Sequence, residues 1–124
     1  MAKYKNKKEK VGNLVFDSKK EADRYRSLMM MQQVGQISDL QIQVKYVLIP
    51  AQYEMQWSER LKGYIKGKCI ERECSYIADF VYKDNKGKTI VEDVKGYKGG
   101  GAYSVFTIKR KLMLHLYGIM IKEV

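Results

Sequence analysis

The sequence predicts an α/β (α+β) protein with a central mixed β-sheet flanked by helices. Two observations support this class: two stretches have apolar residues at helical spacing, and several others alternate between apolar and polar residues. Their order is helix, strand, strand, strand, helix, strand, which is typical of a layered helix-and-sheet architecture. With 124 residues the chain suits one domain. We expect a flexible basic arm over residues 1–13 and a single domain over residues 14–124.

The first helix is expected from Lys19 to Val34. Ser18 and Glu21 have the spacing of a capping box, in which a serine side chain and a glutamate satisfy the free N–H groups of the first turn. Gly35 suits the position directly after the helix, where a left-handed backbone is common.

Three strands are expected after this helix. The period changes to two from Gln41, and this strand ends near Pro50. Residues 51–68 have no clear pattern, and we expect a short helical turn over 56–61 within them. Residues 74–82 and 89–95 are expected to form a hairpin.

The C-terminal part is predicted to be a loop, a helix and a strand. Glycines make residues 96–101 a flexible loop. The helix is expected from Tyr103 to Tyr117 and to stop at Gly118, and the strand from Ile119 to Val124.

The chain is strongly basic, because 24 lysines and arginines oppose 14 acids to give a formal charge of +10. Such an excess favours a polyanionic partner, with DNA ahead of an anionic membrane. The membrane is the weaker candidate, because the sequence has no basic amphipathic helix and no apolar run of the ~18 residues that span a bilayer. We therefore expect a cytoplasmic protein that binds DNA, with lysines that serve only solubility as the alternative.

Cysteine and histidine are too rare for several kinds of site. Cys69 and Cys74 do not make a disulfide framework, and with the single His115 they do not complete a zinc site. The lone histidine also argues against nuclease mechanisms that need several histidines.

The hairpin between Asp79 and Lys95 contains the candidate chemistry. If residues 85–87 form a three-residue loop with Gly87 in the left-handed position, Asp79 lies opposite Asp93. Lys95 then shares the face of Asp93, because side chains alternate along a strand. A two-residue turn would instead place Asp79 against Glu92 and turn Lys95 to the other face.

Two carboxylates directly opposite one another repel, so Asp79 and Asp93 should destabilise the hairpin on their own. A bound divalent cation would reverse that effect, and oxygen ligands suit Mg²⁺ or Mn²⁺. Both acids interrupt otherwise apolar runs, where an unpaired charge is unfavourable. We therefore favour a metal site over the alternative that Asp93 and Lys95 are ordinary hairpin charges.

Asp79 followed by Asp93-Val94-Lys95 on the next strand resembles the metal-site pattern of the PD-(D/E)XK, restriction-endonuclease-like nucleases, with Ala78 where the superfamily's name has proline. Over residues 12–124 the chain also resembles a family of small phage and prophage proteins that is grouped with endonucleases and likened to Holliday-junction resolvases. The segments that carry this resemblance are Ser18–Tyr25, Tyr76–Tyr82, Val91–Gly96 and, near the end, Lys109–Leu112 with Tyr117–Ile119.

The resemblance implies a role for each matching residue. Asp79 and Asp93 would ligate Mg²⁺ or Mn²⁺, with the Val94 carbonyl as a further oxygen. Lys95 would orient or help deprotonate the attacking water and stabilise charge on the phosphate. Glu21 would complete the metal site directly or through water, with a purely capping role as the alternative.

The loop over 96–101 and the helix after it are expected to face DNA, with a solvated surface as the alternative. Lysines and arginines in this region and in the first helix are the candidates for phosphate contacts. These candidates are Lys19, Lys20, Lys98, Lys109, Arg110 and Lys111.

The resemblance implies a divalent-metal-dependent DNA endonuclease, selective for branched DNA such as four-way junctions, that acts in phage DNA recombination, replication or packaging. A homodimer would suit a two-fold symmetric junction. Two alternatives stay open: a non-catalytic basic DNA-binding protein of phage origin, and an interaction protein whose hairpin acids are surface charges.

Overall fold

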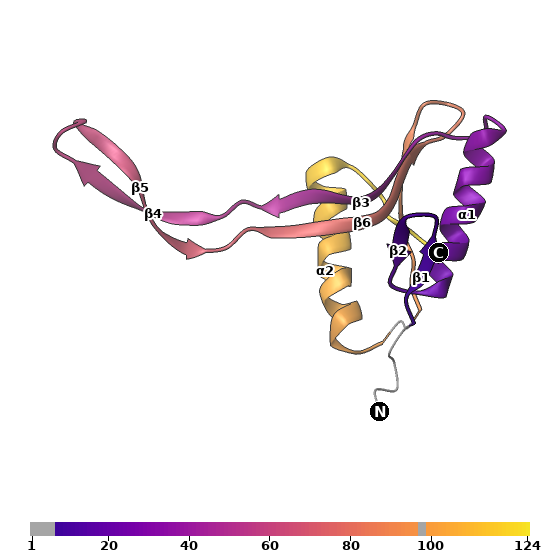
Figure 1. Cartoon of the computed structure of the whole chain (residues 1–124). Coiled ribbons are helices and arrows are strands. Elements are labelled where there is room, and N and C mark those ends of the chain that lie inside the picture. Colours follow the sequence, from indigo (N-terminus) through magenta and orange to yellow (C-terminus); the bar gives the residue numbers. More distant parts are fainter. Residues whose placement is uncertain (1–6, 97–98) are drawn as a thin grey trace.

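A body of two helices and a β-sheet carries a long β-ribbon that projects away from it (Figure 1). The computed structural model describes residues 7–96 and 99–124. The helices are α1 (Lys19–Gln33) and α2 (Gly100–Tyr117). The strands are β1 (Glu9–Val11), β2 (Leu14–Phe16), β3 (Ser38–Ile49), β4 (Gln52–Ser58), β5 (Gly63–Glu71), β6 (Cys74–Lys83), β7 (Thr89–Asp93) and β8 (Lys122–Glu123).

The central sheet has the strand order β3-β6-β7-β8. β6 is antiparallel to both of its neighbours, whereas β7 and β8 are parallel. The predicted α+β class, with a mixed sheet and flanking helices, is therefore confirmed.

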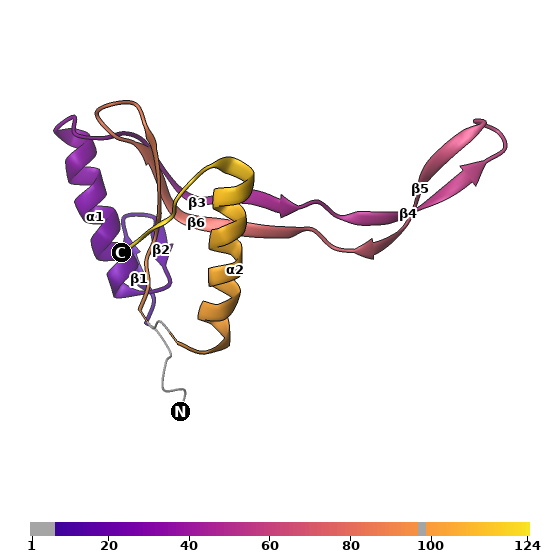
Figure 2. The same ribbon diagram turned by 180° about the vertical axis from the view of Figure 1, so that it is seen from behind.

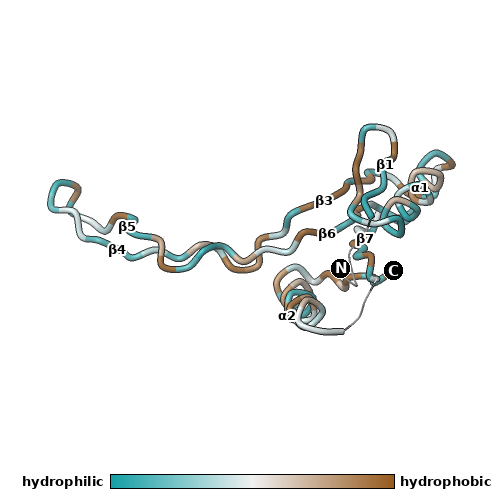
Figure 3. Tube along the Cα trace, turned by 60° about the horizontal axis from the view of Figure 1, so that its bottom comes forward, coloured by the Kyte–Doolittle hydropathy of each residue, from teal (hydrophilic) through white to brown (hydrophobic). Residues whose placement is uncertain are grey.

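The two helices cover opposite faces of this sheet, and each covers its own core (Figure 3). On one face Ala78 and Val91 pack with Met113 of α2. On the other face Phe80 packs with Leu28 of α1, and the β1–β2 hairpin adds Phe16. Because strand β6 supplies side chains to both cores, it is a nearly continuous apolar run, as is typical of a strand buried on both faces.

Within the described parts of the chain, strands β4 and β5 pair only with each other. With their connecting turn they form what we call the arm, residues 52–71. The arm extends the β3–β6 ribbon far beyond both helices (Figure 2). The helical turn predicted over residues 56–61 is wrong, because residues 52–58 form β4. Tyr53, Met55 and Trp57 alternate with polar residues, and this period of two was the signal for a strand.

The N-terminal region is more ordered than predicted. Residues 9–11, which the sequence analysis assigned to the flexible arm over 1–13, form β1 and pair with β2. Gly12 and Asn13 make the tight turn between them, and Gly12 has a left-handed φ of +60°. Residues 1–6 of the predicted flexible arm lie outside the described residues.

The ends of the other elements differ slightly from the prediction. α1 ends one residue earlier, at Gln33, with Val34 as its C-cap. α2 begins at Gly100 rather than Tyr103, so part of the predicted loop is helical, and Gly118 ends it with a left-handed φ of +67°. Strand β7 ends at Asp93, and β8 contains only Lys122 and Glu123. Neither α1 nor α2, in the ranges that the structure describes, is long and apolar enough to cross a bilayer.

Candidate active site

The turn of the β6–β7 hairpin has the predicted three-residue form. The Asp84 N–H donates to the Lys88 carbonyl at 2.9 Å, which closes a loop of residues 85–87. Gly87 has a left-handed φ of +80°, which glycine adopts without strain. The Asp84 carboxylate also accepts hydrogen bonds from the N–H groups of Lys86 and Lys88, so this turn is held in one register.

This register brings the predicted acids together. The paired residues of β6 and β7 run from Lys83–Thr89 to Phe80–Glu92. In this register Asp93 is the residue that would lie opposite Asp79, one step further along the ribbon. The alternative register, with Asp79 against Glu92, is therefore wrong. β6 and β7 thus present two carboxylates to each other at the end of the hairpin farthest from the turn.

The neighbouring ladder between β3 and β6 is interrupted beside Asp79. Gln43, the residue that would pair with Asp79, has a left-handed φ of +51°, which is unusual for a non-glycine residue. Ile42 packs with the α1 core while Val44 packs with the α2 core, so the strand changes the face it presents at this point. Backbone strain of this kind is often found at functional sites. Gln43 Nε2 lies 3.5 Å from Asp79 Oδ1, at the limit of a hydrogen bond.

Hydrogen bonds fix both carboxylates of the hairpin. The Val94 N–H donates to Asp79 Oδ2 at 2.8 Å. Asp93 accepts from the Tyr76 hydroxyl at 2.6 Å through Oδ2, and its Oδ1 lies 2.9 Å from Lys95 Nζ. The side chains of Lys95 and Asp93 are only 17% and 9% exposed, so this ion pair is shielded from solvent. The structure thus confirms that Lys95 shares the face of Asp93.

Lys95 is further restrained from the side of α2. Its ammonium lies 3.5 Å from the centre of the Phe106 ring, a cation–π contact. Its N–H donates to the Val124 carbonyl, so the parallel pairing with β8 continues past the end of β7. Its carbonyl accepts a hydrogen bond from Lys20 of α1. Both helices and β8 therefore hold this residue in place.

Glu21 approaches the two aspartates from the first turn of α1. Ser18 caps the helix by accepting a hydrogen bond from the Glu21 N–H at 3.1 Å, as predicted. Burial first, and then the negative charges of Asp79, Asp17 and Asp93, together raise the pKa of the Glu21 carboxyl to about 7. Glu21 is therefore partly protonated near neutral pH unless a positive charge comes close.

The pKa of Asp79 is also raised by burial and by neighbouring negative charge. Its pKa is raised to about 6, because burial and the charge of Asp93 outweigh the lowering effects of the Val94 N–H, Gln43 and Lys95. Two acids with raised pKa values beside a third acid indicate a pocket with surplus negative charge, a pattern that is common at functional sites.

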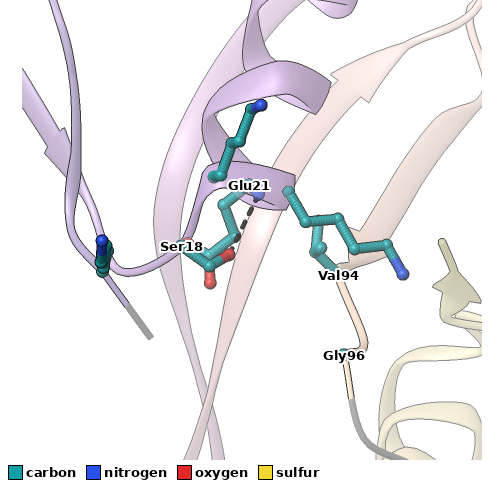
Figure 4. Close-up of a pocket in the computed structure, with 7 residues that line it drawn as sticks. Ser18, Glu21, Val94 and Gly96 are labelled. Atoms are coloured by element: carbon teal, nitrogen blue, oxygen red, sulfur yellow. Dashed lines mark hydrogen bonds between the residues drawn. The ribbon is translucent and has the colours of Figure 1, made fainter. Parts of the chain in front are cut away.

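Three hollows surround this group, with volumes of about 320, 340 and 230 Å³. Figure 4 shows the first, where Ser18 and Glu21 at the end of α1 face Val94 and Gly96 across the gap. The second lies between Asp93, Lys95 and α2, and the third adjoins Glu21 from the side of Gln43. A phosphate group in the first or third hollow would meet Glu21, whereas one in the second would meet Asp93 and Lys95.

The donor atoms fit a hard divalent cation in kind. Glu21, Asp79 and Asp93 offer carboxylate oxygens, which Mg²⁺ and Mn²⁺ prefer. A cation would favour the ionised forms of the first two, whose pKa values are raised by burial and by mutual repulsion. Among the described residues, however, no three His, Cys, Asp or Glu side chains are already grouped closely enough to hold a metal ion. Ligation would therefore require these side chains to move closer together, away from some of their present partners.

The predicted phosphate-contact residues divide into two groups. Lys19 and Lys20 line the hollow beside Glu21, and Lys109 lines the hollow beside Asp93, so these three lie at the site. Arg110 instead pairs with Glu123 at 3.2 Å. Lys111 is exposed and lies about 200° around the helix from Lys109, away from the site. Lys98 lies outside the described residues.

The sequence analysis missed a buried charge cluster behind the site. Glu92 is completely buried, and Arg24 of α1 donates to both of its carboxylate oxygens at 2.7 Å, while Tyr82 donates a third hydrogen bond. Burial acts to raise the pKa of Glu92, but the hydrogen bonds from Arg24 and Tyr82 outweigh it and lower the pKa. Because Arg24 lies one turn after Lys20 and Glu21, this ion pair fixes the start of α1 against β7.

Tyr76 and Gln43 were also missed. Tyr76 lies three residues before Asp79 in an apolar strand, where a tyrosine is unremarkable, and Gln43 was one polar residue in an alternating pattern. No local signal marks either residue.

Comparison with known proteins gives a family and no function. The family model of DUF1064, described as a protein of unknown function, matches residues 1–121. The chain belongs to the DUF1064 family. No curated protein and no solved structure matches the chain.

Proposed function

We propose that this DUF1064 protein is a divalent-metal-dependent DNA endonuclease with a restriction-endonuclease-like core. One observation carries the proposal: Glu21, Asp79, Asp93 and Lys95 come from three separate elements and converge at the point where the β3–β6 ladder is interrupted. Three mutually repelling carboxylates beside a shielded ammonium suit phosphodiester hydrolysis, in which a cation and an amine both face the phosphate.

Asp79, Asp93 and Glu21 would hold Mg²⁺ or Mn²⁺, with the Val94 carbonyl as a further oxygen ligand. The bound ion would supply charge stabilisation at the phosphoryl oxygen and would lower the pKa of bound water. Lys95 is held by Asp93, Phe106 and β8, so its ammonium has a fixed position from which to orient water and stabilise charge on the phosphate. Lys19, Lys20 and Lys109 would contact the DNA backbone on either side.

Selectivity for branched DNA and a role in phage DNA recombination, replication or packaging are the finer parts of the proposal, and they rest on the resemblance in sequence. The basic charge of +10 supports DNA as the substrate class.

A second function, DNA binding without cleavage, is favoured by a specific observation. Both oxygens of Asp93 are already engaged by Tyr76 and Lys95, and Asp79 accepts from the Val94 N–H. If these bonds persist in solution, the carboxylates are structural and the basic surface alone is functional.

A cleavage panel separates the two functions. Linear, nicked, flapped and four-way DNA are incubated with the wild-type protein and with Lys95→Ala, in the presence of Mg²⁺, Mn²⁺ or EDTA. The nuclease proposal predicts cleavage by the wild type with either metal, none with EDTA, and a large loss in Lys95→Ala with retained DNA binding. Salt-dependent binding with no cleavage under any condition would support the second function and overturn the first.

A further inference from the structure

One tyrosine carries a hydroxyl into the otherwise apolar core under α2. Tyr76 is 3% exposed, and among the buried residues described for this core it alone has a hydroxyl, amide or charged group. A phenylalanine would fill nearly the same volume with no polar atom to satisfy, whereas a buried hydroxyl needs a hydrogen-bond partner. The Tyr76 hydroxyl donates to Asp93 Oδ2 at 2.6 Å. Asp93, rather than packing, therefore explains a tyrosine at this position.

Four side chains form a closed ring of contacts that includes this hydrogen bond. The Tyr76 and Phe106 rings have centres 6.2 Å apart, and Lys95 Nζ lies 3.5 Å from the centre of the Phe106 ring. The same ammonium lies 2.9 Å from Asp93 Oδ1, which closes the ring. Tyr76, Asp93 and Phe106 are all buried, and they come from β6, the end of β7 and α2. Packing from three elements therefore fixes the position of the hydroxyl.

A fixed hydroxyl determines how the Asp93 carboxylate is oriented. Because Oδ2 accepts from Tyr76 and Oδ1 faces Lys95, the carboxylate cannot rotate about its Cβ–Cγ bond without losing a partner. An ionised carboxylate has about four acceptor positions, so these two contacts leave lone pairs for a cation. Carboxylates that bind metal ions are themselves held by hydrogen bonds, and loss of such a bond typically weakens metal binding about 10–100-fold.

Strand β6 offers a second tyrosine with the same chemistry. Tyr82 is 4% exposed in the core under α1, and its hydroxyl donates to the Glu92 carboxylate. Glu92, however, already accepts two hydrogen bonds from Arg24, so its charge is compensated within the chain. The two tyrosines therefore differ in the carboxylate that they hold, because one is a candidate metal ligand and the other is part of an ion pair.

We propose that Tyr76 is a positioning residue of the metal centre, whose hydroxyl holds the Asp93 carboxylate in the orientation that binds the cation. This role rests on the proposed function, because it requires Asp93 to be a metal ligand. It adds to the site a buried residue that lies outside the pattern of Asp79 and Asp93-Val94-Lys95.

Mn²⁺ binding to the full chain, measured by isothermal titration calorimetry without DNA, tests this role independently of cleavage. Tyr76→Phe keeps the ring and removes only the hydroxyl, so the Kd for Mn²⁺ should rise about 10–100-fold. The matched control Tyr82→Phe removes the same group from the same strand and should leave the Kd unchanged. Urea denaturation should show that both variants are folded and lose comparable stability, because each leaves a buried carboxylate with one hydrogen bond fewer.

If the wild type binds Mn²⁺ and Tyr76→Phe binds it equally well, the role of Tyr76 is wrong while the proposed function stands. The same holds if Tyr82→Phe weakens binding as much as Tyr76→Phe, since the effect would then come from general loss of packing. A wild type that binds no Mn²⁺ would overturn both. Wild-type crystals grown with Mn²⁺ give a measurement that needs no variant: the Tyr76 hydroxyl should stay within hydrogen-bond distance of Asp93, and a hydroxyl turned away from a metal-bound Asp93 would overturn the role.

Discussion

Strands β3 and β6 run through two different environments along one ribbon. Near the body Ala78 and Phe80 are 0% and 1% exposed because α1 and α2 cover the two faces. Beyond Tyr76 the same ribbon continues into the arm, where no described residue is buried (Figure 1). The body uses its hydrophobic residues to fold and to position acids, whereas the arm presents them to solvent. Similar side chains therefore have different roles in the two regions, and substitutions can separate these roles.

The largest expected effect is on stability. Phe106→Ala should lower the free energy of unfolding by about 3–4 kcal/mol, because this buried ring packs on Tyr76 and Lys95 and its loss leaves a cavity. Tyr64→Ala on the arm should change it by less than about 0.5 kcal/mol. Urea denaturation followed by circular dichroism measures both values. If both variants lost the same free energy of unfolding, the arm would be part of the folded core, and the difference between the body and the arm would not exist.

The nuclease proposal predicts the next effect, on DNA cleavage. Asp93→Asn should lower cleavage by more than about 100-fold, because removal of a metal ligand should exceed the loss caused by a residue that only supports one. DNA affinity should change little, since the basic residues remain. Asp23→Asn, the same change at an exposed position of α1, is the matched control and should cleave normally. Normal cleavage by Asp93→Asn would contradict the proposal that the β6–β7 hairpin binds the metal ion.

A smaller effect on stability is expected for the buried ion pair between Arg24 and Glu92. Arg24→Met leaves the buried Glu92 carboxylate without its bidentate partner and should destabilise the fold by about 2–3 kcal/mol, below the full value for a buried pair because Arg24 is 24% exposed. Arg26→Met breaks the exposed pair with Asp23 and should cost less than about 0.5 kcal/mol. Thermal unfolding measures the loss of stability in each variant. A double variant, Arg24→Met with Glu92→Gln, should recover part of the stability that Arg24→Met loses, because no buried charge is then left unpaired. If Arg24→Met behaves like Arg26→Met, the cluster does not hold α1.

The smallest effect is a dependence of stability on pH. The pKa values of Glu21 and Asp79 are raised to about 7 and about 6, so the folded protein binds these protons more tightly than the unfolded chain does. The two protonated groups therefore contribute fully to the free energy of unfolding below pH ~4, and this contribution is lost as the pH rises through about 6 to 7. After allowance for solvent screening, the free energy of unfolding should fall by about 1 kcal/mol over this range. Denaturation between these pH values should show the fall, and Mg²⁺ should reduce it by compensating the ionised acids. Asp79→Asn should flatten the curve, and a Mg²⁺-independent curve would contradict metal binding.

The part of the site that could be predicted depends on local rules. The sequence Asp84-Asn85-Lys86-Gly87 allows a three-residue turn with glycine in the left-handed position, and the structure selects it over the two-residue alternative. Given that turn, alternation along the strands predicts Asp79, Asp93 and Lys95 on one surface. The Ser18 cap likewise needs only neighbouring residues. These features were predicted because turn geometry and side-chain period are set within a few residues.

The remainder depends on contacts far apart in the sequence. Arg24 and Glu92 are 68 residues apart, and no local pattern pairs them. The left-handed Gln43 arises where the ribbon passes from one helix to the other, which requires the whole fold. The arm and β1 differ from these cases, because local signals for both were present in the sequence. The alternation in β4 was interpreted as a helical turn, and the lysines around Gly12-Asn13 favoured a flexible arm over a hairpin.

The claim that the body holds a metal centre is tested most directly by crystals of the wild type grown with Mn²⁺. The proposal predicts an anomalous difference peak between the carboxylates of Asp79 and Asp93, at roughly 2.0–2.3 Å from their oxygens, and its absence in Asp93→Asn crystals grown in the same way. A map with no peak there, with Tyr76 and Lys95 still bonded to Asp93, would contradict the claim.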